Sequence, residues 1–280
     1  PRAEASAERL AEVLKTEPSV KDPEKPIMSG EMEGCIEFCN VEFAYPNAEE
    51  PVLKEISFAA IPGETTAVIG STGCGKSTLV NLIPRFYDVT GGSILIDNVD
   101  IRNMPLRVLR DKIGFVPQKA FLFSGTIADN LRYGNKNATE EELWHALEVA
   151  QAKDFVMEMP GQLDALIEQG GTNVSGGQRQ RLAIARALIK KPEIYVFDDS
   201  FSALDFKTDA KLRIALKKET LNSTVIIVAQ RVSTIMDANR IIVLSDNGTI
   251  AGIGTHSELM GTCGIYSEIV YSQLSKEEIA

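Results

Sequence analysis

Eight consecutive residues in the first third of the chain limit the possible folds more than any other feature. They match the pattern G-x-x-x-x-G-K-[ST] and are Gly70, Ser71, Thr72, Gly73, Cys74, Gly75, Lys76 and Ser77. An apolar stretch typical of a buried strand precedes them at 65–69, and Leu79, Val80 and Leu82 follow with the spacing of a helix. Glycines let successive backbone N–H groups curve around a phosphate, and a helix N-terminus favours an anion. The sequence therefore predicts a strand–loop–helix unit that binds the phosphates of a nucleotide.

Two further polar positions make a complex of ATP and Mg²⁺ the expected ligand. Within the loop, Lys76 is expected to reach the β- and γ-phosphates and Ser77 to bind Mg²⁺. A run of strand-forming residues at 194–197 ends in Asp198, the Walker B pattern, where a carboxylate can hold Mg²⁺. Many strands end in an aspartate, so this pattern gains its meaning only beside the phosphate-binding loop. Cys74 is interpreted as a filler at a variable loop position.

Strand and helix patterns alternate along most of the chain. Strands are expected at 35–43, 52–60, 65–69, 93–96, 113–116, 194–197, 224–228 and 240–244. Helices are expected at 127–132, 140–150, 177–190 and 208–221, with a further short element at 232–237. This alternation predicts an α/β fold with a largely parallel sheet. Together with the phosphate-binding loop, the pattern resembles a RecA-like P-loop NTPase core with an antiparallel β edge near the N-terminus. The block 125–190 contains only helical patterns and is interpreted as an inserted helical subdomain, which leaves 34–124 and 191–280 to the core.

The N-terminal part of the chain reads as a helix followed by a linker. The helix is expected at 2–15, and its apolar face is formed by Ala7, Leu10, Ala11 and Leu14. The prolines that break it into an extended linker are Pro18, Pro23 and Pro26. Because the chain begins with Pro1 and has no signal-peptide pattern, residues 1–33 are interpreted as a tether from an upstream domain of a longer protein. The composition is also compatible with an ordinary N-terminal helix.

A second glycine-rich helix start lies about twenty residues before Asp198. It consists of Ser175, Gly176, Gly177 and Gln178. Such an N-terminus can bind phosphate, and the alternative is a helix cap without a ligand. In this order, the motifs resemble those of ABC ATPases, whose signature motif is Ser-Gly-Gly-Gln. The similarity runs from about Gly34 to the C-terminus.

The resemblance implies roles for individual residues. Tyr45 matches the aromatic residue that stacks on adenine, and Gln118 matches the Q-loop glutamine that senses Mg²⁺ and the γ-phosphate. Nucleotide contacts are implied for Tyr45, Ser71, Thr72, Gly73, Cys74, Gly75, Lys76, Ser77, Thr78 and Asp198. Magnesium ligation is implied for Ser77, Gln118 and Asp198, catalytic roles for Gln118, Asp199 and Gln230, and a D-loop from Ser202 to Asp205. The segments 121–127 and 3–9 look like those of the exporter subgroup, where the latter resembles the end of the last membrane helix.

The family also implies partners. Two such domains pair head to tail, so that each ATP lies between one P-loop and the signature serine and glycines of the other domain. The second phosphate-type helix start would then serve the nucleotide of the partner. The chain is accordingly expected to work with the transmembrane domains of its transporter at the cytoplasmic face of the cell membrane, as a fragment that is soluble by itself.

Two positions depart from the family pattern. The family places Glu after the Walker B aspartate as the general base, and this chain has Asp199. The Asp carboxylate is one methylene, ~1.5 Å, further back, and displacements of ~1 Å in a catalytic group cost ~10²-fold. The family places His at the switch position, and this chain has Gln230, which donates a hydrogen bond but carries no proton or positive charge. The chain has only two histidines, His145 and His256, and neither fits this strand end.

These departures predict a site that binds ATP and hydrolyses it slowly. The combination resembles the degenerate half of heterodimeric exporters, and so do the segments 168–173 and 198–202. A second, non-identical ABC subunit is therefore expected as partner. The alternative is that Asp and Gln are tolerated substitutes and the site turns over normally.

Composition limits the remaining function classes. The formal net charge is −10 and no basic tract occurs, which argues against nucleic-acid binding. No stretch of ~18 apolar residues is present, so no segment is expected to span a bilayer. The four cysteines, at 35, 39, 74 and 263, form no C-x-x-C pair and are expected to be thiols in a reducing compartment.

Two other function classes are alternatives to export. A soluble ABC ATPase of the DNA-repair or chromosome-organisation type inserts coiled coils or zinc modules into this fold, and neither heptads nor C-x-x-C pairs occur here. A regulatory ATP-binding module without transport is disfavoured by the N-terminal tether.

Overall fold

The computed structural model describes residues 2–27 and 34–273, and its centre is a six-stranded sheet of order β12-β11-β3-β10-β9-β6. The strands are β3 (Thr65–Gly70), β6 (Ile113–Val116), β9 (Ile194–Asp198), β10 (Thr224–Val228), β11 (Arg240–Leu244) and β12 (Ile250–Gly254). All neighbours pair parallel except β12, which runs antiparallel to β11. Every residue of β9 and β10 is buried, as expected for parallel strands covered on both faces. The predicted α/β class is confirmed.

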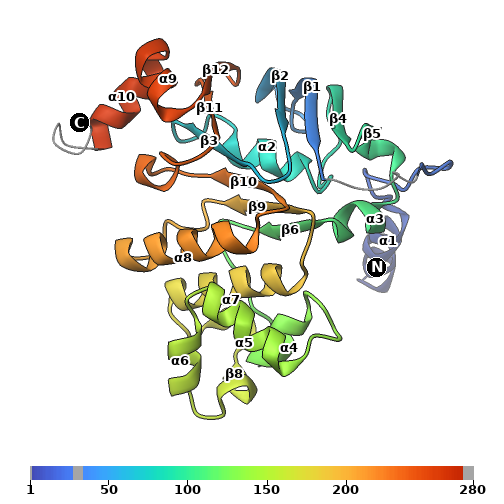
Figure 1. Cartoon of the computed structure of the whole chain (residues 1–280). Helices are drawn as coiled ribbons and strands as arrows, with labels where there is room; N and C mark the ends of the chain where they lie inside the picture. Colours follow the sequence, from blue (N-terminus) through green and yellow to red (C-terminus); the bar gives the residue numbers. More distant parts are fainter. Residues whose placement is uncertain (1, 28–33, 274–280) are drawn as a thin grey trace.

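The antiparallel strands form a sheet of their own. It has the order β2-β1-β4-β5 and contains β1 (Ile36–Phe43), β2 (Leu53–Ala60), β4 (Gly91–Ile96) and β5 (Val99–Asp100). The predicted antiparallel β edge near the N-terminus is confirmed, and the structure adds that it is a separate sheet and not a part of the parallel one. Figure 1 shows this sheet beside the parallel one. The two sheets share a core with α2 (Lys76–Leu82), because an antiparallel sheet needs apolar cover on one face only.

The inserted lobe is mainly helical and lies below the parallel sheet in the view of Figure 1. Its helices are α4 (Ile127–Arg132), α5 (Glu140–Val149), α6 (Lys153–Glu158) and α7 (Gly176–Ile189), with short 3₁₀ turns η2 (Gln162–Asp164) and η3 (Gln169–Gly171). The prediction of a block with helices only is wrong, since β7 (Gly125–Thr126) and β8 (Leu166–Ile167) pair antiparallel. Strands of two residues are too short to show a period of two in the sequence.

The remaining elements complete the two faces of the core. They are η1 (Ile101–Asn103), α3 (Leu106–Asp111), α8 (Phe206–Glu219), η4 (Val232–Thr234), α9 (His256–Thr262) and α10 (Gly264–Gln273). The short element expected at 232–237 begins as η4 and ends at Thr234. The chain shows α3, α6, α9 and α10 where no element was predicted, because each buries only one or two residues and so lacks a long apolar stripe.

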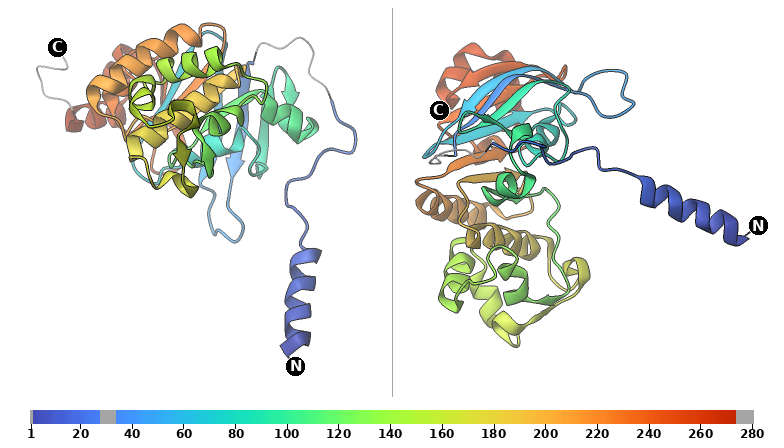
Figure 2. Two further views of the ribbon diagram at one scale, coloured as in Figure 1. Left: turned by 90° about the horizontal axis from the view of Figure 1, so that it is seen from below. Right: turned by 90° about the vertical axis from the view of Figure 1, so that its right-hand side faces the viewer.

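The N-terminal helix α1 (Arg2–Lys15) projects away from the rest of the chain, as Figure 2 shows. The two leucines of its predicted apolar face are mostly exposed to solvent, Leu10 by 65% and Leu14 by 85%. The linker is held near α3, where the Leu106 N–H donates to Asp22 Oδ1 at 2.6 Å. Within the described ranges, no helix has the length and apolar character that a membrane span requires.

Candidate functional site

The P-loop folds around the ammonium group of its own lysine. The loop joins β3 to α2, and Gly73 and Gly75 adopt φ values of 90° and 102°, a region that strains other residues. Lys76 Nζ donates to Gly70 O at 2.9 Å and to Ser71 O at 2.6 Å, and the side chain is buried. The centre of the loop therefore holds a positive charge surrounded by backbone groups, which suits a phosphate.

The expected magnesium ligands meet beside the loop. Ser77 Oγ, on α2, donates to Asp198 Oδ1 at the end of β9, at 3.0 Å. Burial raises the pKa of the Asp198 carboxyl, and the hydrogen bond from Ser77 lowers it. A hydroxyl and a carboxylate at this distance are hard oxygen ligands of the kind that Mg²⁺ prefers, and a cation there would favour the ionised carboxylate.

Two amide side chains donate to the same carboxylate oxygen, and the three residues involved come from three neighbouring strand ends. Gln118 Nε2 donates to Asp199 Oδ2 at 3.0 Å, and Gln230 Nε2 donates to the same oxygen at 2.8 Å. These residues follow β6, β9 and β10, which are adjacent in the sheet, so their carboxyl ends share one edge. The structure thus brings together all the residues expected to be catalytic.

The backbone of Asp199 is fixed as firmly as its side chain. Its φ is 45°, in the left-handed region that Asp adopts more readily than most residues. The Asp199 N–H donates to Val228 O at 3.0 Å, and Ser202 Oγ donates to Asp199 O at 2.8 Å. The carboxylate therefore starts from a defined position at the strand end.

Tyr45 lies against the first turn of α2. Its hydroxyl is 3.0 Å from Thr78 Oγ1, and its ring packs edge-on against Phe43 and Tyr87. Cys74 is buried, with its sulfur 3.8 Å from Lys76 Nζ, which agrees with a filling role. The residues implied to contact adenine and phosphate thus surround the N-terminal turn of α2.

The signature motif lies apart from this cluster, at the N-terminus of α7. Ser175 Oγ accepts a hydrogen bond from the Gln178 N–H at 3.2 Å, and Gln178 Oε1 accepts one from the Ser175 N–H at 2.9 Å. A Cβ at Gly177 would lie 3.2 Å from Ala203 O, so this glycine permits close packing on the D-loop. A Cβ at Gly176 would meet nothing within 4 Å. The capping box explains Ser175 and Gln178 locally, and Gly176 has no packing reason.

The D-loop is held between the signature helix and the switch segment. Arg231 Nη2 donates to Ser202 O at 3.1 Å, and Asp205 caps α8 by accepting from the Thr208 N–H at 3.0 Å. Arg231 was not predicted as a site residue, although it directly follows Gln230.

Two other contacts of the site carry no recognisable sequence signal. Gln273, in α10, donates from Nε2 to Gln230 O at 2.8 Å and accepts from the Val232 N–H at 2.8 Å. Ser71 Oγ donates to Asp246, in the turn between β11 and β12. Only the turn composition around Asp246 marks that position in the sequence.

Comparisons with known proteins agree with this arrangement. The family model described as ABC transporter matches residues 53–202, more than half of the chain. An uncharacterised ABC transporter ATP-binding protein of Mycobacterium tuberculosis is 50% identical over 277 residues, which is 98% of this chain and 47% of that protein. A β-(1→2)glucan export ATP-binding/permease protein of Rhodopseudomonas palustris is 44% identical over 277 residues, covering 98% of this chain and 46% of that protein.

A solved structure of a bacterial Atm1-family ABC exporter with ATP bound is also similar. It superposes with a TM-score of 0.90 at 36% identity, over 96% of this chain and 47% of that one. The chain spans about half the length of the curated relatives it matches. From the matched motifs, the fold and these relatives, we conclude that the chain belongs to the ABC transporter family.

Proposed function

We propose that this chain is the ATP-binding domain of an ABC exporter, and that its own P-loop site binds Mg-ATP but hydrolyses it slowly. One observation carries the proposal: the carboxylate of Asp199, one methylene shorter than the family's glutamate, accepts its hydrogen bonds within the described residues from the neutral amides of Gln118 and Gln230. Binding groups are complete, since Lys76 fills the loop and Ser77 meets Asp198. Binding is therefore retained while the chemical step is weakened.

Each residue has a defined task in this proposal. Tyr45 stacks on adenine, Lys76 contacts the β- and γ-phosphates, and Ser77, Gln118 and Asp198 hold Mg²⁺. When bound, Mg²⁺ neutralises charge that develops on the phosphates. Asp199 orients the attacking water from a position ~1.5 Å too far back, a displacement of the size that costs ~10²-fold.

The two amides limit the site further. Gln118 and Gln230 both donate from Nε2 to Asp199 Oδ2, which leaves each amide a second N–H and a carbonyl oxygen for other partners. Gln118 can therefore offer its carbonyl oxygen to a metal, and Gln230 its second N–H to a γ-phosphate. Neither amide has a titratable proton to transfer.

A second, non-identical ABC domain completes the functional unit. The P-loop of this chain has its ligands from α2, β3 and β9, whereas Ser175 and Gly176 are exposed on the lobe. Head-to-tail pairing places this signature on the ATP of the partner. Because the signature keeps the family pattern and Asp199 and Gln230 do not, hydrolysis takes place in the partner's P-loop site.

The transmembrane domains of the exporter dock between the core and the lobe. A cavity of about 290 Å³ there is lined by aromatic residues and by three cations, Arg110, Arg186 and Lys190, and burial lowers the pKa values of the last two. Exposed Phe86, Phe123 and Tyr133 at this cavity offer an apolar surface for a partner. The relative from R. palustris is named as an export permease, and this chain would work likewise at the cytoplasmic face of the membrane.

The domain limits follow from the same proposal. Residues 1–33 form the tether to the membrane domain, 34–124 and 191–280 the core, and 125–190 the helical subdomain. The alternative, a soluble ABC ATPase of the DNA-repair or chromosome-organisation type, is not favoured, because the matched relatives carry transporter and exporter names.

The test is nucleotide binding against turnover in the isolated 280-residue chain. A fluorescent ATP analogue should bind in the presence of Mg²⁺, while phosphate release stays far below one per second per chain. Turnover of several per second by this chain alone would contradict a slow site. Failure to bind the analogue would contradict the assignment of the P-loop itself.

A further inference from the structure

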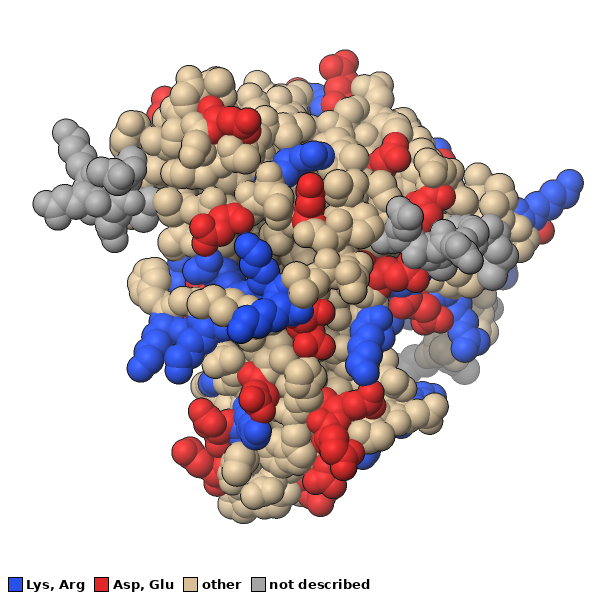
Figure 3. Space-filling model, in the orientation of Figure 1, with Lys and Arg blue, Asp and Glu red and all other residues tan. Residues whose placement is uncertain are grey.

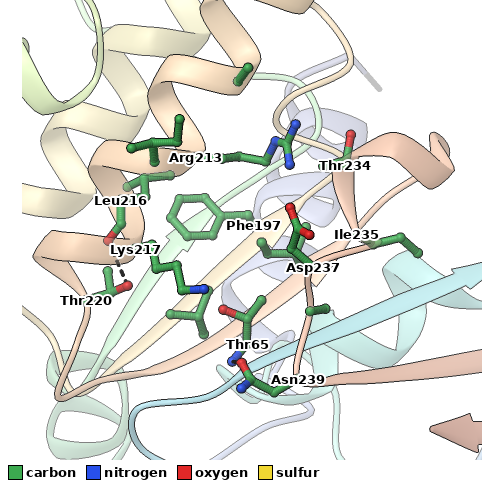
Figure 4. Close-up of a pocket in the computed structure, with 15 residues that line it drawn as sticks. Thr65, Phe197, Arg213, Leu216, Lys217, Thr220, Thr234, Ile235, Asp237 and Asn239 are labelled. Atoms are coloured by element: carbon green, nitrogen blue, oxygen red, sulfur yellow. Dashed lines mark hydrogen bonds between the residues drawn. The ribbon is translucent and has the colours of Figure 1, made fainter. Parts of the chain in front are cut away.

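A cavity of about 530 Å³ lies along α8, and it is separate from the P-loop site. Its floor is apolar and includes Phe197, Val225 and Ile227 from two central strands, with Leu216 and Ile235 at the sides. Figure 4 shows the ring of Phe197 in the middle of the space between α8 and the segment that follows η4. This volume lies within the range of sites that bind small molecules.

Two cations of α8 line one wall. Arg213 and Lys217 are four residues apart and therefore lie on the same side of the helix. In Figure 4 the guanidinium of Arg213 extends toward Thr234 and Asp237, and the ammonium of Lys217 extends toward Thr65 and Asn239. The ring of Phe197 lies between them. An anion bound here would meet Lys217 and the guanidinium of Arg213, which also has an ion pair with Asp209, above an aromatic floor.

The hydrogen-bonding capacity of these cations is only partly used. Arg213 Nε is buried without a hydrogen bond, although it lies 3.4 Å from Asp209 Oδ1 in an ion pair. In the parts of the chain that the structure describes, Lys217 has no ion-pair partner. Donors of this kind gain charge-assisted hydrogen bonds when a carboxylate or sulfonate arrives.

The charge around the cavity attracts anions in a protein that is acidic as a whole. The net charge of the chain is −10, yet α8 also carries Lys207, Lys211 and Lys218. Figure 3 shows Lys and Arg atoms gathered over α8. Such a local field raises the concentration of anions near the surface. Asp237 is the only acid in the lining and disfavours ligands with several negative charges.

We propose that this cavity binds a small monoanion with a flat apolar body, such as an aromatic carboxylate or sulfonate. The anionic group lies between Arg213 and Lys217, and the apolar body covers Phe197 and Ile235. Arg213 is already ion-paired with Asp209 and Asp237 is acidic, so a ligand with a single negative charge is favoured over one with several. This assignment goes beyond the proposed function and does not depend on it, since the site needs neither ATP nor a second domain.

The walls of the cavity continue directly into the nucleotide site. Phe197 precedes Asp198, α8 begins immediately after Asp205, and Thr234 follows Gln230 by four residues. A ligand that shifts α8 or η4 would therefore move the D-loop or the switch glutamine. Occupancy is expected to change ATP hydrolysis in an assembled transporter without competing for the P-loop.

The probe for the test is anilinonaphthalene sulfonate, a fluorescent monoanion, with uncharged phenylnaphthylamine as its neutral counterpart. Both are titrated into the 280-residue chain without nucleotide. We expect one saturable site for the sulfonate, weakened about tenfold by Arg213→Gln and by Lys217→Gln, because each removes a charge-assisted hydrogen bond. Binding of the neutral probe should change less than twofold in these variants.

Matched controls lie on the same helix. Lys211→Gln and Lys218→Gln remove the same charge from exposed positions that do not line the cavity, so they should change the sulfonate affinity less than twofold. Ala210→Leu fills the cavity without altering its charge and should weaken both probes. Thermal unfolding of every variant establishes that it is folded, and if Arg213→Gln is not, the exposed Lys217→Gln alone decides.

Several results would overturn the proposal. Equal losses in the Lys211 and Lys218 variants would mean general attraction to a basic surface. Displacement of the sulfonate by ATP would place the probe in the P-loop, and the absence of saturable binding would mean that the cavity takes no such ligand. None of these results bears on slow hydrolysis at Asp199.

Discussion

The chain contains two glycine-rich helix starts, and they differ in which groups accept hydrogen bonds from their first backbone N–H donors. At α2, Gly75 precedes the helix in a left-handed conformation, no side chain caps the end, and Lys76 folds back onto loop carbonyls. At α7, Ser175 and Gln178 cap each other. The first helix start has no side-chain cap, so its N–H donors stay available for a ligand. The second has a reciprocal side-chain cap and lies on an exposed surface.

In the proposed head-to-tail pairing, this difference separates the nucleotide site of this chain from the one shared with a second molecule. The α2 end is surrounded by Asp198, Asp199 and their hydrogen-bond partners, so its ligand-binding groups come from this chain. The α7 end presents Gly176 to open space, and its first N–H groups lack intrahelical acceptors. We expect changes at α2 to act on binding by this chain, and changes at α7 to act only in the assembled transporter.

The largest effect is expected from Ser175→Ala combined with Gly176→Asp. Gly176 is preferred to Gly177 because a side chain at Gly177 would press on Ala203 of the same chain. A carboxylate facing the partner's γ-phosphate should cost several kcal/mol, so ATPase activity of the assembled transporter should fall more than about 100-fold. Binding of the ATP analogue to the isolated chain should stay unchanged.

A matched cap distinguishes this effect from loss of a helix start. Thr139 caps α5 in the same lobe with the same reciprocal hydrogen bonds to Glu142. Thr139→Ala should lower the melting temperature slightly and leave activity intact. Similar activity losses in both variants would show that the signature helix acts through stability alone.

The next largest effect is expected from Lys76→Ala in the isolated chain. Removing a charged hydrogen-bond donor from the phosphate should weaken binding of the ATP analogue by about 2 kcal/mol, roughly thirtyfold. Fluorescence titration with Mg²⁺ measures it. Lys190→Ala is the control, because Lys190 also donates to two backbone carbonyls but lies far from the P-loop. Equal losses in both would mean that lysine removal acts on the fold.

A gain is expected when the two altered positions are restored to the family pattern. Asp199→Glu with Gln230→His should raise phosphate release by on the order of tenfold, because the carboxylate regains the ~1.5 Å of one methylene and the switch regains an imidazole. The double variant should exceed the product of the single effects, since both groups act on one water and one phosphate. No gain in the assembled transporter would place the limit in the partner's signature.

The smallest effect is expected from Asp199→Ala in the assembled transporter. If hydrolysis takes place in the partner's P-loop site, total ATPase activity should change less than about twofold, as measured by steady-state phosphate release. Asp198→Ala is tested beside it and should abolish magnesium-dependent nucleotide binding at this chain. Abolished turnover here, together with activity spared in the Ser175 and Gly176 variant, would reverse our assignment of the two sites.

The sequence by itself determined the local units. It predicted β6, β10 and β11 with the observed bounds, the loop at Lys76 and the strand end at Asp198. Each of these is encoded within about ten neighbouring residues, by an apolar period or by glycines that a phosphate-binding turn requires. The chemical identity of Asp199 and Gln230 was likewise readable, because their places are fixed by the nearby strands.

Only the tertiary structure decided how distant segments meet. Gln118 and Asp199 are 81 residues apart, Asp199 and Gln230 are 31 apart, and the strand order makes them share one carboxylate oxygen. Packing between distant segments also decides three other features. These are the hydrogen bond from Gln273 to Gln230 O, the separate antiparallel sheet and the cavity beside Arg213. Sequence periodicity records which face of an element is buried, and it does not record which other element covers that face.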